Sequence, residues 1–436
     1  MAAMNESNLY RAVWRWHFYA GLVVLPLLAW MATTGALYLY KPELERLFYG
    51  RWIEGVATSP PLPVSTLIAR TKAQVDGPVT QVMRPTIPGE SWRMTFTDRL
   101  GQDRLAFVDP DSGALLGMSS TGGPMDLVKQ LHSLSVAGPI GNALVEIAAG
   151  WAILLVLTGV YLWWPRAGNR ALSLAGKVAE RRFWRNLHAS VGIVAGGIIL
   201  FLAVTGMPWT VFWGAQFHAF VAREGIGRPP APSAPADAHH DAHLPWSLRG
   251  TTPPHGSMLP DLGPDRALAI AEARGLSPPW TLDLPAARGR PYRITAAADQ
   301  TWKIRVIYVD PGTGTVLQDV RYKDFGLGAR LFEWGIATHQ GRQYGEANRL
   351  IMLLGCLATL MLAATAPIMW WKRRHGEGLR PPPPSDDRAK ARGVAGIMLA
   401  VGVLFPLTGL SMLLALAGRT LSIRIGRRLG KGMVGG

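Results

Sequence analysis

Long apolar runs without a single Asp, Glu, Lys or Arg most strongly limit what this chain can fold into. Five of them occur, at Phe18 to Tyr40, Ile147 to Trp164, Ala189 to Phe212, Leu350 to Trp371 and Val394 to Ala417. A helix of about 20 apolar residues crosses the roughly 30 Å hydrocarbon layer of a bilayer. The sequence therefore predicts a membrane α-helical protein with five spans. The first run is too long for a signal-peptide core and lacks a small-residue cleavage site, so we expect it to be retained.

The basic residues lie beside these runs and set the expected orientation. The formal charge of +16 could indicate a nucleic-acid partner, but Lys and Arg gather in the loops 166–185 and 372–392. Such loops face the cytoplasm in membrane proteins. Arg11 and Arg15 place the N-terminus on the same side, and segments 41–140 and 213–345 on the opposite side. We therefore expect lipid and no nucleic acid as a partner. Five crossings leave the basic tail 418–436 outside, against this rule.

An internal repeat relates the two halves of the chain. His17, Gly21, Thr34 and Gly35 recur at the same spacing as His188, Gly192, Thr205 and Gly206. A second set recurs in the same way: His132, Gly138, Thr158, Trp163 and Trp164 correspond to His339, Gly345, Thr365, Trp370 and Trp371. Both copies start and end on the cytoplasmic side, so we expect them to be related by an axis along the membrane normal.

The segments outside the membrane also correspond to each other. The first is expected to contain a helix at Val64 to Val75 and strands at Trp92 to Thr97 and Leu105 to Val108, and the second a helix at Asp265 to Arg274 and strands at Tyr292 to Ala296 and Lys303 to Val309. Each second strand runs into an Asp-Pro turn, at Asp109 and at Asp310. The repeated unit is thus a helix, an α+β module and a helix. The Pro-rich and Ala-rich stretch 228–246 is interpreted as a linker within the second copy.

Four histidines lie at repeated helix ends, where a polar ring in or near hydrocarbon is costly unless it has a partner. The repeat places His17 and His188 near the cytoplasmic face and His132 and His339 near the outer face. Two imidazoles on facing helices are the ligands that a planar iron porphyrin takes above and below its iron. Hydrogen bonding at the interface, or one metal ion, remains an alternative, although no repeated Cys, Asp or Glu completes a metal site. The repeated Thr-Gly pairs indicate either close helix packing or room for a bulky ligand.

The remaining polar candidates are weaker. His239, His240 and His243 form a cluster within the linker, which holds no fixed ligand geometry and has no counterpart in the first copy. Cys356 is the only cysteine and lies in the fourth run. It excludes a disulfide within the chain and a covalently attached haem motif. No Gly-x-Gly-x-x-Gly fingerprint of a dinucleotide-binding domain lies between a strand and a helix. If the histidines bind haem, we therefore expect a separate reductase or a quinol to donate electrons to it.

At these residues the sequence resembles the PepSY-associated transmembrane family, which includes bacterial iron-regulated inner-membrane proteins and siderophore reductases. The resemblance rests on Trp16-His17-Phe18, Leu131-His132, His188 and Thr338-His339-Gln340-Gly341, on the Thr-Gly pairs, and on two modules with Asp-Pro turns that look like PepSY domains. It implies b-type haem, one or two per chain, with His17, His132, His188 and His339 as axial ligands of the iron. It also implies electron passage from the cytoplasm to a ferric siderophore in the periplasm.

The resulting domain scheme follows the repeat. It comprises 1–40 with the first span, 41–130 as PepSY-like module 1, 131–164 as the second span with its preceding histidine, 165–187 as a cytoplasmic loop, 188–212 as the third span, 213–338 as linker and PepSY-like module 2, 339–371 as the fourth span with its histidine, 372–392 as a cytoplasmic linker, 393–417 as the fifth span and 418–436 as a basic tail.

The expected function is a transmembrane haem-dependent ferric reductase in iron acquisition, located in the bacterial inner membrane. A non-enzymatic binding protein, in which the PepSY-like modules restrain a partner, is an alternative, although an anchor does not need four matched histidines. A transporter of iron chelate or metal is another, because the parallel repeat permits it. Against transport, the spans lack charged residues for coupling apart from Glu146 at an edge.

Overall fold

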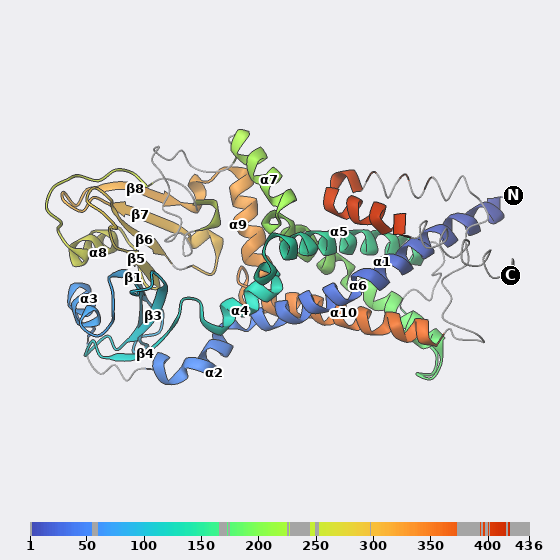
Figure 1. Cartoon of the computed structure of the whole chain (residues 1–436), viewed down its shortest axis with the longest axis horizontal. Coiled ribbons are helices and arrows are strands. Elements are labelled where there is room, and N and C mark those ends of the chain that lie inside the picture. Colours follow the sequence, from blue (N-terminus) through green and yellow to red (C-terminus); the bar gives the residue numbers. More distant parts are fainter. Residues whose placement is uncertain are drawn as a thin grey trace, which may run out of the picture. The chain divides into compact units, whose positions relative to one another are not determined.

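The computed structural model describes residues 2–54, 60–164, 175–224, 245–248, 253–296, 298–372 and 402–415, together with a few isolated positions (Figure 1). The chain forms two compact units. The helical unit comprises residues 1–36, 130–218 and 350–436, and the sheet unit comprises 37–129 and 219–349. The linker cluster of His239, His240 and His243 lies outside the described residues, as does His375.

Within the described residues, four helices are long and apolar enough to cross a membrane. They are α1 (Ala2–Leu39), α5 (Gly138–Trp163), α6 (Arg181–Gly206), which runs on into a 3-10 turn at Met207–Trp209, and α10 (Gly345–Trp371). The protein is therefore a membrane protein whose helices contact lipid. Of the predicted fifth span, 393–417, the structure describes 402–415 and a few isolated positions, and this part contains only a shorter apolar helix, Pro406–Ala415, so a fifth span is not confirmed.

Small residues allow the long helices to approach one another. Ala20 and Val24 of α1 pack against Ala148 and Leu154 of α5 in one apolar cluster. In α10, a Cβ at Gly355 would lie 2.6 Å from Cγ2 of Ile198 in α6, so α6 and α10 touch where that side chain is missing. This close packing through small residues is typical of helices in membranes. Shorter helices complete the unit: α4 (Gly123–His132), which ends in it, and α7 (Phe212–Arg223), which begins in it.

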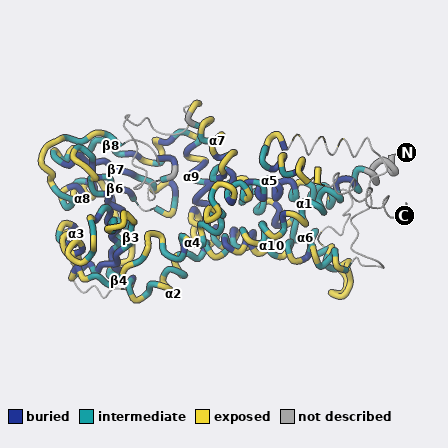
Figure 2. The backbone as a smooth tube through the Cα atoms, in the orientation of Figure 1, coloured by how far each residue is buried: buried dark blue, intermediate teal, exposed yellow. Residues whose placement is uncertain are grey.

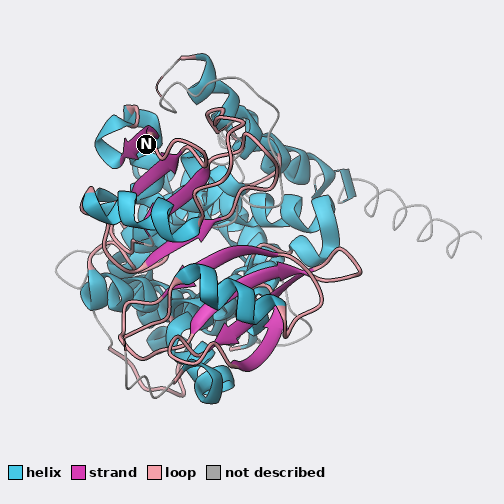
Figure 3. Cartoon of the chain, turned by 90° about the vertical axis from the view of Figure 1, so that its left-hand side faces the viewer, coloured by secondary structure: helices cyan, strands magenta, loops and turns pink. Residues whose placement is uncertain are grey.

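One antiparallel sheet of eight strands forms the sheet unit, in the order β4-β3-β2-β1-β5-β6-β7-β8. Its strands are the magenta arrows in Figure 3. The strands are β1 (Val79–Arg84), β2 (Trp92–Thr97), β3 (Asp103–Val108), β4 (Leu115–Ser120), β5 (Trp280–Asp283), β6 (Tyr292–Ala296), β7 (Arg305–Val309) and β8 (Val316–Arg321). In the middle, β1 pairs with β5, with Val82 opposite Leu282. The strand order outward from this pair is the same on both sides.

The central strands of the sheet are largely buried (Figure 2), and the alternation of residues along each strand gives the sheet two faces. Trp92, Met94 and Phe96 of β2 share one face, since successive side chains of a strand point to opposite sides. Helices α3 (Val64–Lys72) and α8 (Pro264–Ala273) cover that face and contribute to the same core. The opposite face is covered by α2 (Lys41–Ile53), whose Tyr49 and Trp52 rings contact Phe107 at tilted angles, and by α9 (Leu327–His339), which packs near Tyr308.

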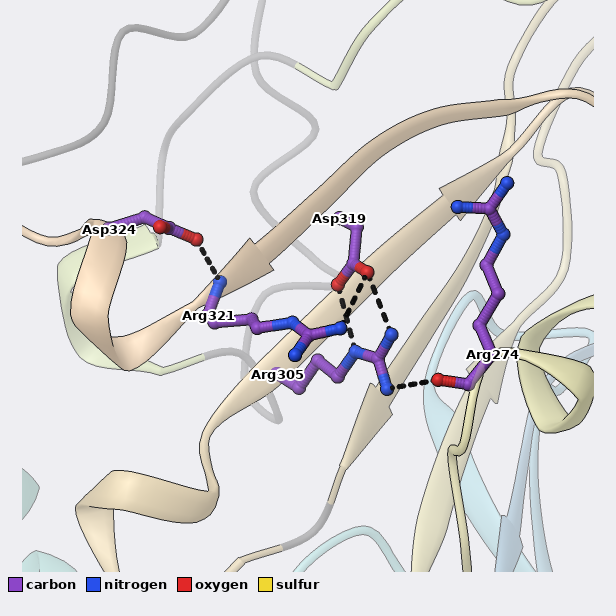
Figure 4. A network of polar contacts seen from close by, with 5 residues as sticks. All are labelled: Arg274, Arg305, Asp319, Arg321 and Asp324. Atoms are coloured by element: carbon purple, nitrogen blue, oxygen red, sulfur yellow. Dashed lines mark hydrogen bonds and ion pairs between the residues drawn. The ribbon is translucent and has the colours of Figure 1, made fainter.

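A charged network holds the outer edge of the sheet (Figure 4). Arg305 of β7 binds Asp319 of β8 through two hydrogen bonds of 2.8 and 2.7 Å, and Arg321 adds a third of 3.3 Å. The hydrogen bond from Arg305 lowers the pKa of Asp319, although partial burial opposes the shift. Arg305 also donates to the backbone carbonyl of Arg274 after α8, so the network fixes this helix to the sheet.

Candidate functional site

His17 and His188 face each other within the helical unit. His17 lies on α1 and His188 on α6, and their ring centroids are 6.5 Å apart with planes at 86°. Imidazole is a common ligand of iron, so His17 and His188 are the two side chains of this pair that would hold a haem or a metal ion.

A threonine on the neighbouring helix holds each of these rings. His17 Nδ1 lies 2.8 Å from Thr158 Oγ1 on α5, and His188 Nδ1 lies 2.8 Å from Thr365 Oγ1 on α10. Each hydroxyl also lies within hydrogen-bond distance of a carbonyl in its own helix, at Leu154 for Thr158 and at Leu362 for Thr365.

These contacts favour one tautomer of each ring. A threonine hydroxyl has a single proton. When that proton goes to the helix carbonyl, the hydroxyl oxygen can only accept from the imidazole, so Nδ1 carries the ring proton and Nε2 keeps its lone pair. A hydrogen bond at Nδ1 that leaves Nε2 available is the usual arrangement around metal-ligating histidines. The donor set of this pair therefore fits a haem iron.

His132 is held in the same way at the end of α4. Its Nδ1 lies 3.1 Å from Thr34 Oγ1, which also donates to the carbonyl of Trp30. A Cβ at Gly35 would lie 3.2 Å from His132 Cε1, so the ring sits directly against this glycine. Trp30 Nε1 donates to the carbonyl of Leu131 at 2.8 Å, which fixes the end of α4 on α1. The Thr34-Gly35 pair thus forms part of the environment of a candidate ligand.

His339 occupies the last turn of α9, in the sheet unit. Asn348 Nδ2 donates to the carbonyl of the preceding Thr338 at 3.0 Å, and Gly341 follows with φ of 72°. Because His132 belongs to the helical unit and His339 to the sheet unit, and each unit is described by itself, the pairing of these two rings stays a prediction.

The threonines are the part of the site that the sequence did not assign. Thr34, Thr158 and Thr365 recur in the repeat, but their contacts with the rings join residues 98, 141 and 177 positions apart. The usable signal was that these threonines recur together with the histidines. In the described part of the chain, no group of three or more His, Cys, Asp or Glu residues could hold a metal ion. His218, outside the repeated set, lies 3.0 Å from the carbonyl of Pro208 through Nε2.

Comparison with protein families gives a match over most of the chain. No curated protein matches the chain. The family model described as the PepSY-associated TM region matches residues 14–373, which include all four repeated histidines and most of both units, and the protein therefore belongs to this family.

Proposed function

We propose that this protein is a haem-b electron-transfer protein of the bacterial inner membrane that reduces a ferric siderophore in the periplasm. The observation that carries the proposal is the pair of His17 and His188, with ring centroids 6.5 Å apart and each Nδ1 held by a threonine. A bound haem would supply one-electron chemistry at its iron, which no side chain of the pair can supply.

The chain's own residues would then hold and tune the two sites. His17 and His188 provide the ligands on the cytoplasmic side, and we propose His132 and His339 for a second haem on the periplasmic side. Thr158, Thr365 and Thr34 keep the rings in the tautomer that exposes Nε2. Hydrogen bonds of this kind also raise the basicity of a metal-bound imidazole and thereby influence its redox potential.

The proposed topology gives the electron path its direction. The N-terminus and the basic loops 166–185 and 372–392 lie in the cytoplasm by the positive-inside rule, and the sheet unit lies in the periplasm. The unit of helix, PepSY-like module and helix is duplicated about an axis along the membrane normal, which is consistent with the symmetric strand order. Electrons enter from a separate cytoplasmic reductase or a quinol and leave on the side of the sheet unit.

Reduction of the substrate would release its iron. Siderophore oxygens are hard ligands that hold Fe(III) more tightly than Fe(II), because the higher charge binds them more strongly. The protein therefore needs to position the chelate within electron-transfer reach of the periplasmic haem and does not need acid-base groups. We propose that the sheet unit forms the surface against which the chelate docks.

The test is a reduced-minus-oxidised spectrum and a haem-to-protein ratio for protein purified from haem-replete cells. We expect a b-type band and two haems per chain. The double variant H17A/H188A should lose one haem, whereas H218A, which removes a histidine outside the repeated set, should lose none. A protein without a b-type band, or a double variant with the same haem content as H218A, would refute the proposal.

Two further measurements separate the alternatives. A non-enzymatic PepSY binding protein should keep its partner after H17A/H188A, whereas a reductase should lose electron transfer. A transporter should carry labelled chelate into proteoliposomes that contain no electron donor, whereas a reductase should leave the chelate outside and reduce it only when a donor is present.

A further inference from the structure

An exposed aromatic surface lies on the sheet unit beside the start of α10. Trp302, in the 3-10 turn η5 (Thr301–Lys303), is 57% exposed, and Tyr344 is 56% exposed. Their ring centroids are 6.4 Å apart, and Trp334 Nε1 donates to Tyr344 Oη at 2.9 Å. We call Trp302, Lys303, Trp334 and Tyr344 the Trp302 patch. Exposure of two large rings side by side is unfavourable in water and indicates a surface with a partner.

A buried glutamine fixes this patch to the segment that leads into α10. Gln343 is 2% exposed, and its side chain binds Thr301 at two points. Oε1 accepts from the Thr301 backbone N–H at 3.1 Å, and Nε2 donates to Thr301 Oγ1 at 3.0 Å. Trp302 therefore keeps a fixed position relative to Gly345, the first residue of α10.

Two candidate membrane spans have their ends close to this patch. The span of α10 begins at Gly345 and that of α1 ends at Leu39. Within the sheet unit, Arg349 joins these ends, because its guanidinium lies 4.7 Å from the ring centre of Tyr40 and forms an ion pair with Glu43. A Cβ at Gly341 would also lie 3.0 Å from Leu39. Tyr344 and the attached Trp302 thus lie next to the residues at which two candidate spans end.

The side chains of the Trp302 patch are of the kinds found at the membrane–water interface. Trp and Tyr are enriched at the membrane–water interface, where the ring contacts the acyl boundary and the polar atom stays hydrated. Lys303 is exposed next to Trp302 and can contact lipid phosphate. We propose that the Trp302 patch inserts into the phospholipid headgroup layer and anchors the sheet unit on the bilayer. A lipid partner is favoured over a soluble one because the patch is continuous with the start of a span.

Site-specific labelling of the full chain in nanodiscs tests this proposal. Cys356 is the only cysteine, so the C356A background accepts a single label. A fluorophore at W302C is compared with the same fluorophore at M258C. Met258 is 75% exposed and follows Ser257, which binds Asp310 beyond the far end of β7 from Trp302. A five-residue strand separates the two sites by roughly 16 Å.

We expect nitroxide-labelled headgroup lipids to quench the label at position 302 at least threefold more than the label at 258, and aqueous iodide to show the opposite order. A label at K303C leaves Trp302 intact and should be quenched like the label at W302C. This control shows that the result does not come from removal of the indole. Labels at 302 and 303 that match the label at 258 overturn the proposal. So does a label at 302 that becomes protected from iodide only when ferric chelate is added, because the patch then binds the substrate.

Discussion

Replacing Thr158 with valine should weaken haem binding at the proposed cytoplasmic-side site of His17 and His188, called the inner site below, without changing the shape of the helix interface. The hydroxyl lies 2.8 Å from His17 Nδ1 and 2.6 Å from the carbonyl of Leu154. In T158V the helix carbonyl loses a side-chain donor that it does not need, whereas the imidazole N–H of His17 loses its hydrogen bond to Thr158 Oγ1. Leaving a buried donor unsatisfied costs about 1–3 kcal/mol.

This range agrees with an independent estimate for metal sites. Loss of a hydrogen bond to a metal-ligating imidazole commonly weakens metal binding by about 10- to 100-fold, which corresponds to roughly 1.4–2.8 kcal/mol. We therefore expect haem to leave the inner site of T158V about 10 to 100 times more readily than the inner site of the unmodified protein.

The assay is transfer of haem from purified protein to an excess of a high-affinity haem acceptor, followed by absorbance. Thr359 supplies the matched control, because its hydroxyl donates to the carbonyl of Gly355 within α10. T359V should behave like the unmodified protein, and T158S, which keeps the hydroxyl, should restore most of the affinity. Equal haem loss in T158V and T359V would refute the reasoning that the threonine sets the tautomer.

Three further predictions concern single side chains. G35A should reduce haem retention at the proposed periplasmic site but not at the inner one, because the new Cβ would lie 3.2 Å from His132 Cε1; haem content per chain measures it. G117A should lower the free energy of unfolding by about 1–3 kcal/mol, since the new Cβ would overlap the Trp52 ring, and denaturant-induced change in Trp fluorescence reports it. Burial alone would raise the pKa of Asp310, but hydrogen bonds from Ser257 and neighbouring backbone amides outweigh this effect and lower the pKa. The carboxylate therefore stabilises the fold at neutral pH, and this contribution disappears as the pH falls below the ordinary pKa of Asp, about 4. D310N should lower the melting temperature at pH 7, and the difference from the unmodified protein should shrink as the pH falls toward the pKa of Asp310 in the folded state.

The sequence predicted those parts of the fold that have a strong local pattern. The strands Trp92–Thr97 and Tyr292–Ala296 are confirmed with the predicted bounds. The predicted helix 64–75 begins at Val64 as predicted and ends three residues earlier, and the predicted helix 265–274 is shifted by one residue at each end. The four long helices are likewise confirmed as candidate spans. Alternating or continuous apolar residues mark each of these elements, so the signal lies within the element itself.

Elements that depend on distant partners were not predicted. Strand β1 (Val79–Arg84) has a mixed composition and is buried because β2 and β5 pair with it on both sides. Helix α2 carries charges throughout, and only its Tyr49 and Trp52 reveal that it covers the sheet. Tertiary contacts decided both, and local propensity carries little information about such contacts.

The candidate site shows the same division. The repeat alone placed His17 and His188 opposite each other, and the structure brings their rings to 6.5 Å, while the haem assignment itself stays a prediction. The contact of Thr158 with His17 could not be predicted, since the rotation of each helix about its axis decides which side chain meets the ring.

The pairing of β1 with β5 also constrains how the protein is made. These strands lie about two hundred positions apart in the chain, yet Val82 and Leu282 share one core with residues of both halves of the sheet. In the first half of the sheet, β1 therefore has no partner strand on its central side until two further spans have been synthesised and inserted. Long-range strand pairing of this kind is slow and leaves an aggregation-prone edge exposed in the meantime. Biogenesis of the sheet unit thus requires completion of α5 and α6 in the membrane before its core can close.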